Sequence, residues 1–158
     1  MAPRKEVSIS LLSFLFLAIL PIGLGSLYRL PSLASRPMPT DEAVLGVKLA
    51  DYAKSGQFQY DPTDYHGPAL HQVSLLWSKL DGWDSDPAKW TESDLRMVSV
   101  ICGLMLLLVT FMFSDVLGRL GTALAMLMSA VSPMMVFYSR YFIMEMQLTL
   151  LIALTLGC

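Results

Sequence analysis

Residues 97–114, MVSVICGLMLLLVTFMFS, decide the fold class of this chain because the run is apolar and contains no charged side chain. A run of this length is typical of a helix that spans a bilayer. Further apolar runs lie at residues 7–30, 122–138 and 142–158. Because a bilayer offers no water to backbone polar groups, segments that cross it fold as helices. We therefore expect an all-α membrane protein with about four transmembrane helices, one for each run.

The composition also favours a membrane protein. Hydrophobic residues make up 54% of the 158 residues and charged residues 15%, whereas soluble domains have about 25% charged residues. The net charge of −2 and the isoelectric point of about 5.6 provide no basic surface for nucleic acid, so none is expected as a partner. Cys102 and Cys158 lack the spacing of a disulfide framework or a zinc site.

Residues 31–96 form a long polar loop between the first two apolar runs. This loop holds most of the acidic residues of the chain. Pro39-Thr40-Asp41-Glu42 is typical of a helix start, and the helical pattern continues to Gly56. A second helix is predicted from Pro68 to Leu80, with its leucines on one face. Both helices are amphipathic and could lie at the membrane surface.

The basic residues in the short flanking segments predict the orientation. Arg4 and Lys5 precede the first run and Arg119 follows the second, which places residues 1–6 and the turn at residues 115–121 in the cytoplasm. The loop at residues 31–96 then lies outside, in a multi-pass protein of the cytoplasmic membrane. Arg29 and Arg36 oppose this assignment.

The first apolar run has a second interpretation, a cleaved signal peptide that ends near Ser32-Leu33-Ala34. The apolar part of a signal peptide usually has only about 7–15 residues. The run here is longer and further apolar runs follow it, which favours an uncleaved anchor.

Two groups of polar residues in the loop could carry chemistry. Asp41 and Glu42 are adjacent carboxylates that could act as a general base or bind a divalent cation such as Mg²⁺ or Mn²⁺ through Asp41. Acids in the first turn also stabilise any helix through its dipole. His66, in a His-Gly-Pro turn, could present its imidazole to a substrate, or the turn could simply start a helix.

Arg140 and Glu145 lie at the border of the last apolar run. Charges at such a position are costly, which makes the pair a candidate functional site. The guanidinium of Arg140 could bind a phosphate. Alternatively, Arg140 extends into the lipid headgroups and Glu145 pairs with it there.

The order of these motifs resembles the N-terminal part of the GT-C superfamily of membrane glycosyltransferases. The resemblance runs from about residue 10 to residue 158 and depends on RPMPTDE, YHGPALH, LGRLG and YSRY followed by Glu145. The chain is most similar to the protein O-mannosyltransferase-like and aminoarabinose-transferase-like group. Within that group, YDPTDYHGPALH is closest to a prokaryotic flippase-associated subgroup of N-glycosylation.

The resemblance implies transfer of a sugar from a polyprenyl-phosphate donor to an acceptor on the outer face, with inversion. Asp41 and Glu42 would be the catalytic acids, and Arg140, Glu145 and His66 would face the substrate. Members of the superfamily have more spans, so the chain is expected to be truncated and inactive without further C-terminal spans or partner subunits. An alternative is a non-enzymatic membrane subunit that assists flipping or transport of lipid-linked sugars, and a truncated inactive enzyme is a third reading.

Overall fold

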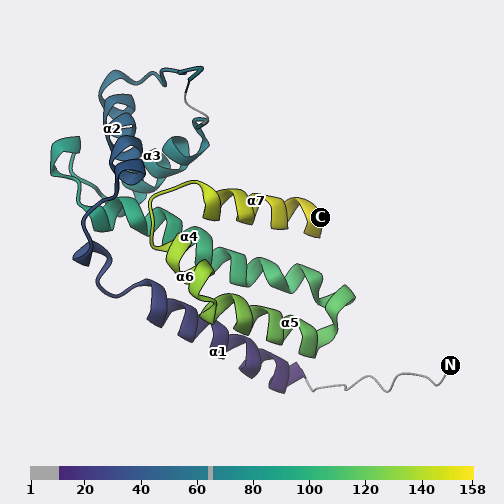
Figure 1. Ribbon diagram of the computed structural model, residues 1–158. Helices are drawn as coiled ribbons and strands as arrows, with labels where there is room; N and C mark the ends of the chain where they lie inside the picture. Colours follow the sequence, from purple (N-terminus) through teal and green to yellow (C-terminus); the bar gives the residue numbers. More distant parts are fainter. Residues whose placement is uncertain (1–10, 64–65) are drawn as a thin grey trace, which may run out of the picture.

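The computed structural model describes residues 11–63 and 66–158 (Figure 1). The predicted cytoplasmic segment at residues 1–6 lies outside the described residues, as does the start of the first apolar run. Within the described ranges the chain is helical and has no strand, which confirms the all-α class. The α-helices are α1 (Leu11–Arg29), α2 (Thr40–Ser55), α3 (Ala69–Asp81), α4 (Glu92–Val109), α5 (Ser114–Val131), α6 (Pro133–Ser139) and α7 (Glu145–Gly157).

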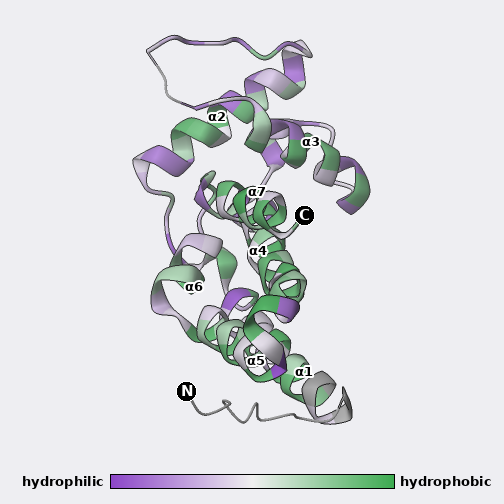
Figure 2. Cartoon of the chain, turned by 90° about the vertical axis from the view of Figure 1, so that its right-hand side faces the viewer, coloured by the Kyte–Doolittle hydropathy of each residue, from purple (hydrophilic) through white to green (hydrophobic). Residues whose placement is uncertain are grey.

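Four helices, α1, α4, α5 and α7, lie side by side with their axes roughly aligned (Figures 1 and 2). Helix α1 packs mainly against α5, and α4 packs mainly against α7. Helices α2 and α3 gather at one end of this bundle (Figure 1). We call this the loop end; it also contains residues 30–39 and the α6–α7 connection at residues 140–144. The candidate site residues predicted from the sequence therefore lie on segments that meet at one end of the bundle.

Two stretches of the described chain, Phe16–Ser35 and Glu92–Val131, are long and apolar enough to cross a membrane. The second is folded into α4 and α5, which a 3-10 turn (Thr110–Phe113) connects. Hydrophobic residues predominate along the bundle helices, whereas hydrophilic residues are frequent on α2 and α3 (Figure 2). A signal sequence or the core helix of a soluble protein meets the same criterion of length and composition. Helix α7 is apolar but has 13 residues, about 20 Å of helix.

The apolar run at residues 122–138 does not form one continuous helix. Helix α5 ends at Val131, Ser132 has a non-helical ψ of 122°, and Pro133 begins α6. Proline lacks a backbone N–H and cannot continue the hydrogen bonding of the preceding helix. The predicted turn at residues 115–121 also differs, because it lies within α5, where Gly118 with φ 70° produces a kink.

The two predicted loop helices are confirmed as α2 and α3. Each is followed by a glycine in the left-handed conformation, Gly56 with φ 69° and Gly82 with φ 70°, where a side chain would be strained. Neither helix is a detached surface element. A buried cluster joins them to α4 and to the α6–α7 connection: Leu45, Leu49, Leu70, Leu95, Val98 and Phe142.

The contact between α4 and α6 generates the first prediction. A Cβ atom added to Gly103 would lie 2.7 Å from the Cβ of Ser139, whereas a Cβ at Gly23 would meet nothing within 4 Å. We expect Gly103→Ala to destabilise the protein by about 1–3 kcal/mol, because overpacking forces the two helices apart. Gly23→Ala should leave thermal unfolding in detergent unchanged or slightly raise its midpoint, since alanine favours the helix. Equal midpoints for the two variants would contradict the close approach of α4 and α6.

Candidate functional site

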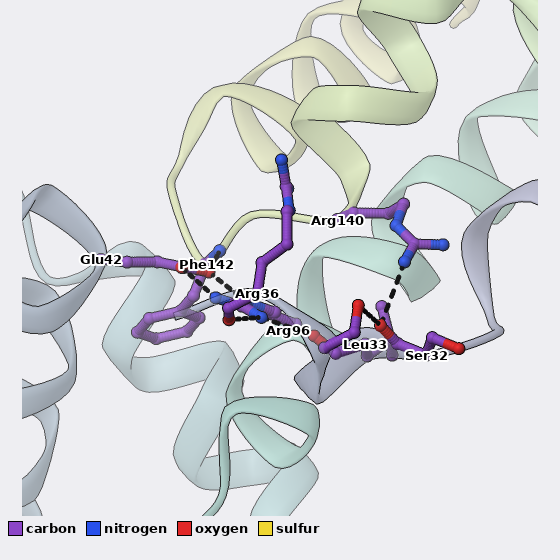
Figure 3. Close-up of polar contacts among 8 residues, drawn as sticks. Ser32, Leu33, Arg36, Glu42, Arg96, Arg140 and Phe142 are labelled. Carbon is purple, nitrogen blue, oxygen red and sulfur yellow. Dashed lines mark hydrogen bonds and ion pairs between the residues drawn. The ribbon is translucent and has the colours of Figure 1, made fainter. Parts of the chain in front are cut away.

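A buried ion pair between Glu42 of α2 and Arg96 of α4 is the centre of the loop end (Figure 3). Both side chains are at most 1% exposed. The carboxylate of Glu42 accepts hydrogen bonds from Arg96 Nε at 2.8 Å and Nη2 at 2.6 Å. Its Oε1 atom also accepts the backbone N–H of Phe142 at 2.7 Å. The predicted acidic motif is thus joined directly to the segment that follows Arg140.

Arg96 also organises the connection between α1 and α2. Its Nη1 atom donates to the carbonyl oxygens of Leu33 and Arg36, the latter at 3.0 Å. Helix α4 begins with a capping box in which Thr91 and Asp94 exchange hydrogen bonds, an arrangement that satisfies the free N–H groups of a helix start. Arg96 lies one turn further along, and the position of its guanidinium is therefore set by the start of a regular helix.

Arg140 caps the end of α1 (Figure 3). Its Nη1 atom donates to the carbonyl oxygens of Tyr28 at 2.9 Å and Arg29 at 3.5 Å, and its Nη2 atom donates to that of Ser32 at 3.2 Å. Carbonyl groups at a helix C-terminus have no partner within the helix and carry partial negative charge. Burial lowers the pKa of Arg140, and the charges of Arg36 and Arg96 lower it further.

Arg29 does the same for α5. Its guanidinium is buried and donates to the carbonyl oxygens of Ser129 at 3.0 Å and Ala130 at 2.8 Å, as well as to Gly25 in its own helix. These carbonyls lack helical partners because α5 ends at Val131 and Pro133 has no backbone N–H to donate. Two helix ends are therefore capped by arginines from other segments, Arg29 of α1 and Arg140 of the α6–α7 connection.

The other predicted site residues are placed as follows. Asp41 is exposed beside the buried Glu42, and Glu145 is exposed in the first turn of α7. The guanidinium of Arg140 bonds to α1 rather than to Glu145. His66 is half-buried before α3. In residues 11–63 and 66–158, no three or more His, Cys, Asp or Glu side chains are grouped so that they could hold a metal ion.

Three arginines at the loop end were not predicted from the sequence as site residues: Arg29, Arg36 and Arg96. Arg29 and Arg96 border apolar runs, and a charge in that position is a signal for a specific partner. Arg36 lies in the loop, where one basic residue among many gives no such signal. Only the folded chain brings its guanidinium over the rings of Phe137 and Tyr141, at 5.3 Å and 4.8 Å from their centres.

His71 of α3 is a buried titratable group outside this cluster. Its ring is fully buried and lies against Phe58, with 5.5 Å between the ring centres. Among the described residues, neither ring nitrogen has a hydrogen-bond partner of good geometry. Burial lowers the pKa of His71 because the charged imidazolium is poorly solvated there.

Comparison with known proteins adds nothing to these contacts. The chain matches no protein-family model, no curated protein and no solved structure. A functional assignment must therefore come from the residues of the loop end themselves.

The buried ion pair yields a stability prediction. Glu42→Gln should lower the free energy of unfolding by about 3–5 kcal/mol, because it leaves the charge of Arg96 buried without a partner. The double variant Glu42→Leu/Arg96→Met should recover only part of this loss, since it removes both charges but leaves the carbonyls of Leu33 and Arg36 and the N–H of Phe142 without these side-chain partners. Asp84→Asn, which breaks the exposed ion pair with Lys89, is the matched control and should change stability by less than about 0.5 kcal/mol. The measurement is unfolding by SDS in mixed micelles, and a Glu42→Gln variant as stable as Asp84→Asn would contradict this account.

The burial of His71 predicts a pH dependence of stability. The folded state disfavours the protonated ring, so in acid the unfolded chain takes up a proton more readily than the folded chain does. Stability should therefore be constant above about pH 6.5, the ordinary pKa of histidine, and should fall as the pH drops below it. His71→Gln should flatten this acid-side slope in thermal unfolding, whereas His66→Gln should retain it. A slope unaffected by His71→Gln would exclude this histidine as its source.

Proposed function

We propose that the chain is part of an integral membrane glycosyltransferase that moves a sugar from a polyprenyl-phosphate donor to an acceptor on the outer face, with inversion. The observation that carries this proposal is the bond network of Glu42. Through Arg96 and the N–H of Phe142, this carboxylate ties the acidic motif of the loop to the segment containing Arg140. An acid and a cationic group are thus held at one end of the bundle, as the reaction requires.

Asp41 is the candidate general base. Its carboxylate is exposed, whereas the neighbouring carboxylate of Glu42 is engaged by Arg96 and Phe142. A group that removes a proton from an acceptor hydroxyl must reach the substrate. We therefore give Asp41 the proton transfer, and give Glu42 the role of a positioning residue that fixes the start of α2.

The donor set does not favour a divalent cation at Asp41. Hard cations such as Mg²⁺ take several oxygen ligands, and the nearest acid along the chain, Glu42, is fully occupied. The proposed reaction therefore uses no step through a metal ion. The negative charge that develops on the leaving phosphate needs stabilisation by cationic groups instead, and Arg140, only partly buried, is one of them.

The membrane explains why such groups collect at the end of a helical bundle. A polyprenyl chain lies in the hydrocarbon layer, so its phosphate lies at the membrane surface. If Phe16–Ser35 and Glu92–Val131 cross the membrane, the loop end lies at that surface on the outer side, and the opposite end lies in the cytoplasm. Glu145 at the start of α7 and His66 before α3 are then further candidates to contact the sugar.

Transfer activity tests the proposal. In a membrane-reconstituted protein that contains this chain, Asp41→Asn should lower transfer from a polyprenyl-phosphate sugar by about 10²–10⁴-fold, the contribution of a general base. Asp51→Asn is the matched control, because Asp51 is an exposed acid on the same helix. Equal rates for wild type and Asp41→Asn would remove Asp41 from the mechanism.

A second outcome would favour the non-enzymatic alternative. If neither wild type nor any variant transfers sugar, but the protein accelerates movement of a lipid-linked sugar across vesicle membranes, the chain belongs to a flipping or transport subunit. That alternative needs a cationic group such as Arg140 for the phosphate but does not need Asp41.

A further inference from the structure

Four guanidinium groups lie at the loop end: Arg29, Arg36, Arg96 and Arg140. Among the described residues, the one carboxylate found in an ion pair with any of them is that of Glu42, which is bound by Arg96. Like charges held close together repel, and the charges of Arg36 and Arg96 both disfavour the charged form of Arg140. The cluster therefore has an excess of positive charge that a bound anion would neutralise.

Three of the four guanidiniums are already occupied by structural bonds. Arg29 caps α5, and Arg96 holds Glu42 and the α1–α2 connection. Arg140 caps α1 through Nη1 and bonds to Ser32 of the α1–α2 connection through Nη2. A ligand that took over these bonds would uncover helix-end carbonyls. These three arginines can offer a bound anion their positive charge and any unbonded N–H groups, but not all the N–H groups of a guanidinium.

Arg36 differs from the others. Its side chain is exposed, and the guanidinium lies over the rings of Phe137 and Tyr141. Within the described part of the chain, its guanidinium contacts are with these two rings, and it forms no hydrogen bond there. Stacking on a ring fixes the plane of a guanidinium and leaves the N–H groups at its edge free. In Figure 3 the side chain of Arg36 extends away from the backbone between the Glu42–Arg96 pair and Arg140.

The backbone beneath this side chain is also fixed. The carbonyl oxygen of Arg36 accepts a hydrogen bond from Arg96 Nη1 at 3.0 Å. Arg36 is therefore anchored at its backbone by the buried ion pair and at its head by two aromatic rings. A binding group that is ordered before the ligand arrives loses less conformational freedom on binding.

We propose that Arg36, stacked on Phe137 and Tyr141 beside Arg140, is the residue that binds a phosphate group at the loop end. A planar guanidinium with a free edge matches two phosphate oxygens, and the neighbouring guanidinium of Arg140 adds charge. The assignment of this phosphate to a lipid rests on the proposed function, which puts the loop end at the membrane surface. Free inorganic phosphate has the same chemistry and is distinguished by experiment.

Binding to the detergent-solubilised full chain tests this site by calorimetry with three probes. Farnesyl phosphate carries the phosphate and an isoprenoid chain, farnesol carries the chain alone, and inorganic phosphate carries the anion alone. We expect farnesyl phosphate to bind, and Arg36→Gln to weaken it by about 10- to 100-fold, the effect of losing charge-assisted hydrogen bonds. Tyr141→Leu should weaken binding less, because it removes the platform and keeps the charge.

Two controls keep the result interpretable. Arg119→Gln removes an exposed arginine near the start of α5, the helix whose other end Arg29 caps, and should not change binding. Arg36→Lys keeps the charge without the fork and should fall between wild type and Arg36→Gln. Arg36→Gln should lower the thermal unfolding midpoint only slightly, since it removes the ring contacts of an exposed guanidinium but no hydrogen bond of the described structure.

Wild-type affinity in Arg36→Gln, or equal binding of farnesol and farnesyl phosphate, would overturn the proposal. Inorganic phosphate binding as tightly as farnesyl phosphate would overturn the lipid assignment. A failure of the proposed function can be distinguished from a failure of this site. If Asp41→Asn transfers sugar normally while Arg36→Gln loses phosphate binding, Asp41 is not the general base but the phosphate site stands.

Discussion

The structure of the loop end depends on the need to satisfy buried polar groups where helices stop. Helices α1 and α5 end there with carbonyl groups that have no helical partner. Arg140 of the α6–α7 connection and Arg29 of α1 supply the missing donors. Arg96 does the same for the α1–α2 connection and pairs with Glu42. The charge of Glu42 is tolerated in the interior because this carboxylate is paired and accepts three hydrogen bonds. These long-range bonds fix the mutual positions of segments that are distant in sequence.

Local patterns in the sequence predicted much of the helical structure. The apolar runs, the acidic start of α2 and the glycine at its end act over a few residues, and the corresponding helices are present. The break at Pro133 and the shift of the turn before Gly118 were not predicted, because hydropathy measures apolar character and not helix continuity. The span of each helix relative to a bilayer stays a prediction, since composition alone cannot distinguish a buried helix from a membrane helix.

The sequence indicated candidate residues for the site but not the different position and contacts of each side chain. Asp41 and Glu42 are adjacent in sequence and chemically alike, so no pattern could tell that one is exposed and the other buried. That difference arises because α2 packs against α4 and presents Glu42 toward Arg96. Arg140 was expected to bind a phosphate or to pair with Glu145 among the lipid headgroups, yet its guanidinium caps α1. Such roles depend on tertiary contacts that span about a hundred residues of sequence.

A structural role for these arginines and a role in binding an anion are compatible. Each capping bond holds a cation in place without neutralising it fully, because a carbonyl group carries only partial charge. Each arginine that caps a helix end adds one positive charge at a fixed position. A cluster built in this way is preorganised for an anion, and preorganised charges stabilise developing negative charge without the cost of reorientation during reaction. The bonds that close the bundle thus also create the positive field in which a phosphate would be held. In our proposal the guanidinium of Arg36, which takes no part in capping, contacts that phosphate.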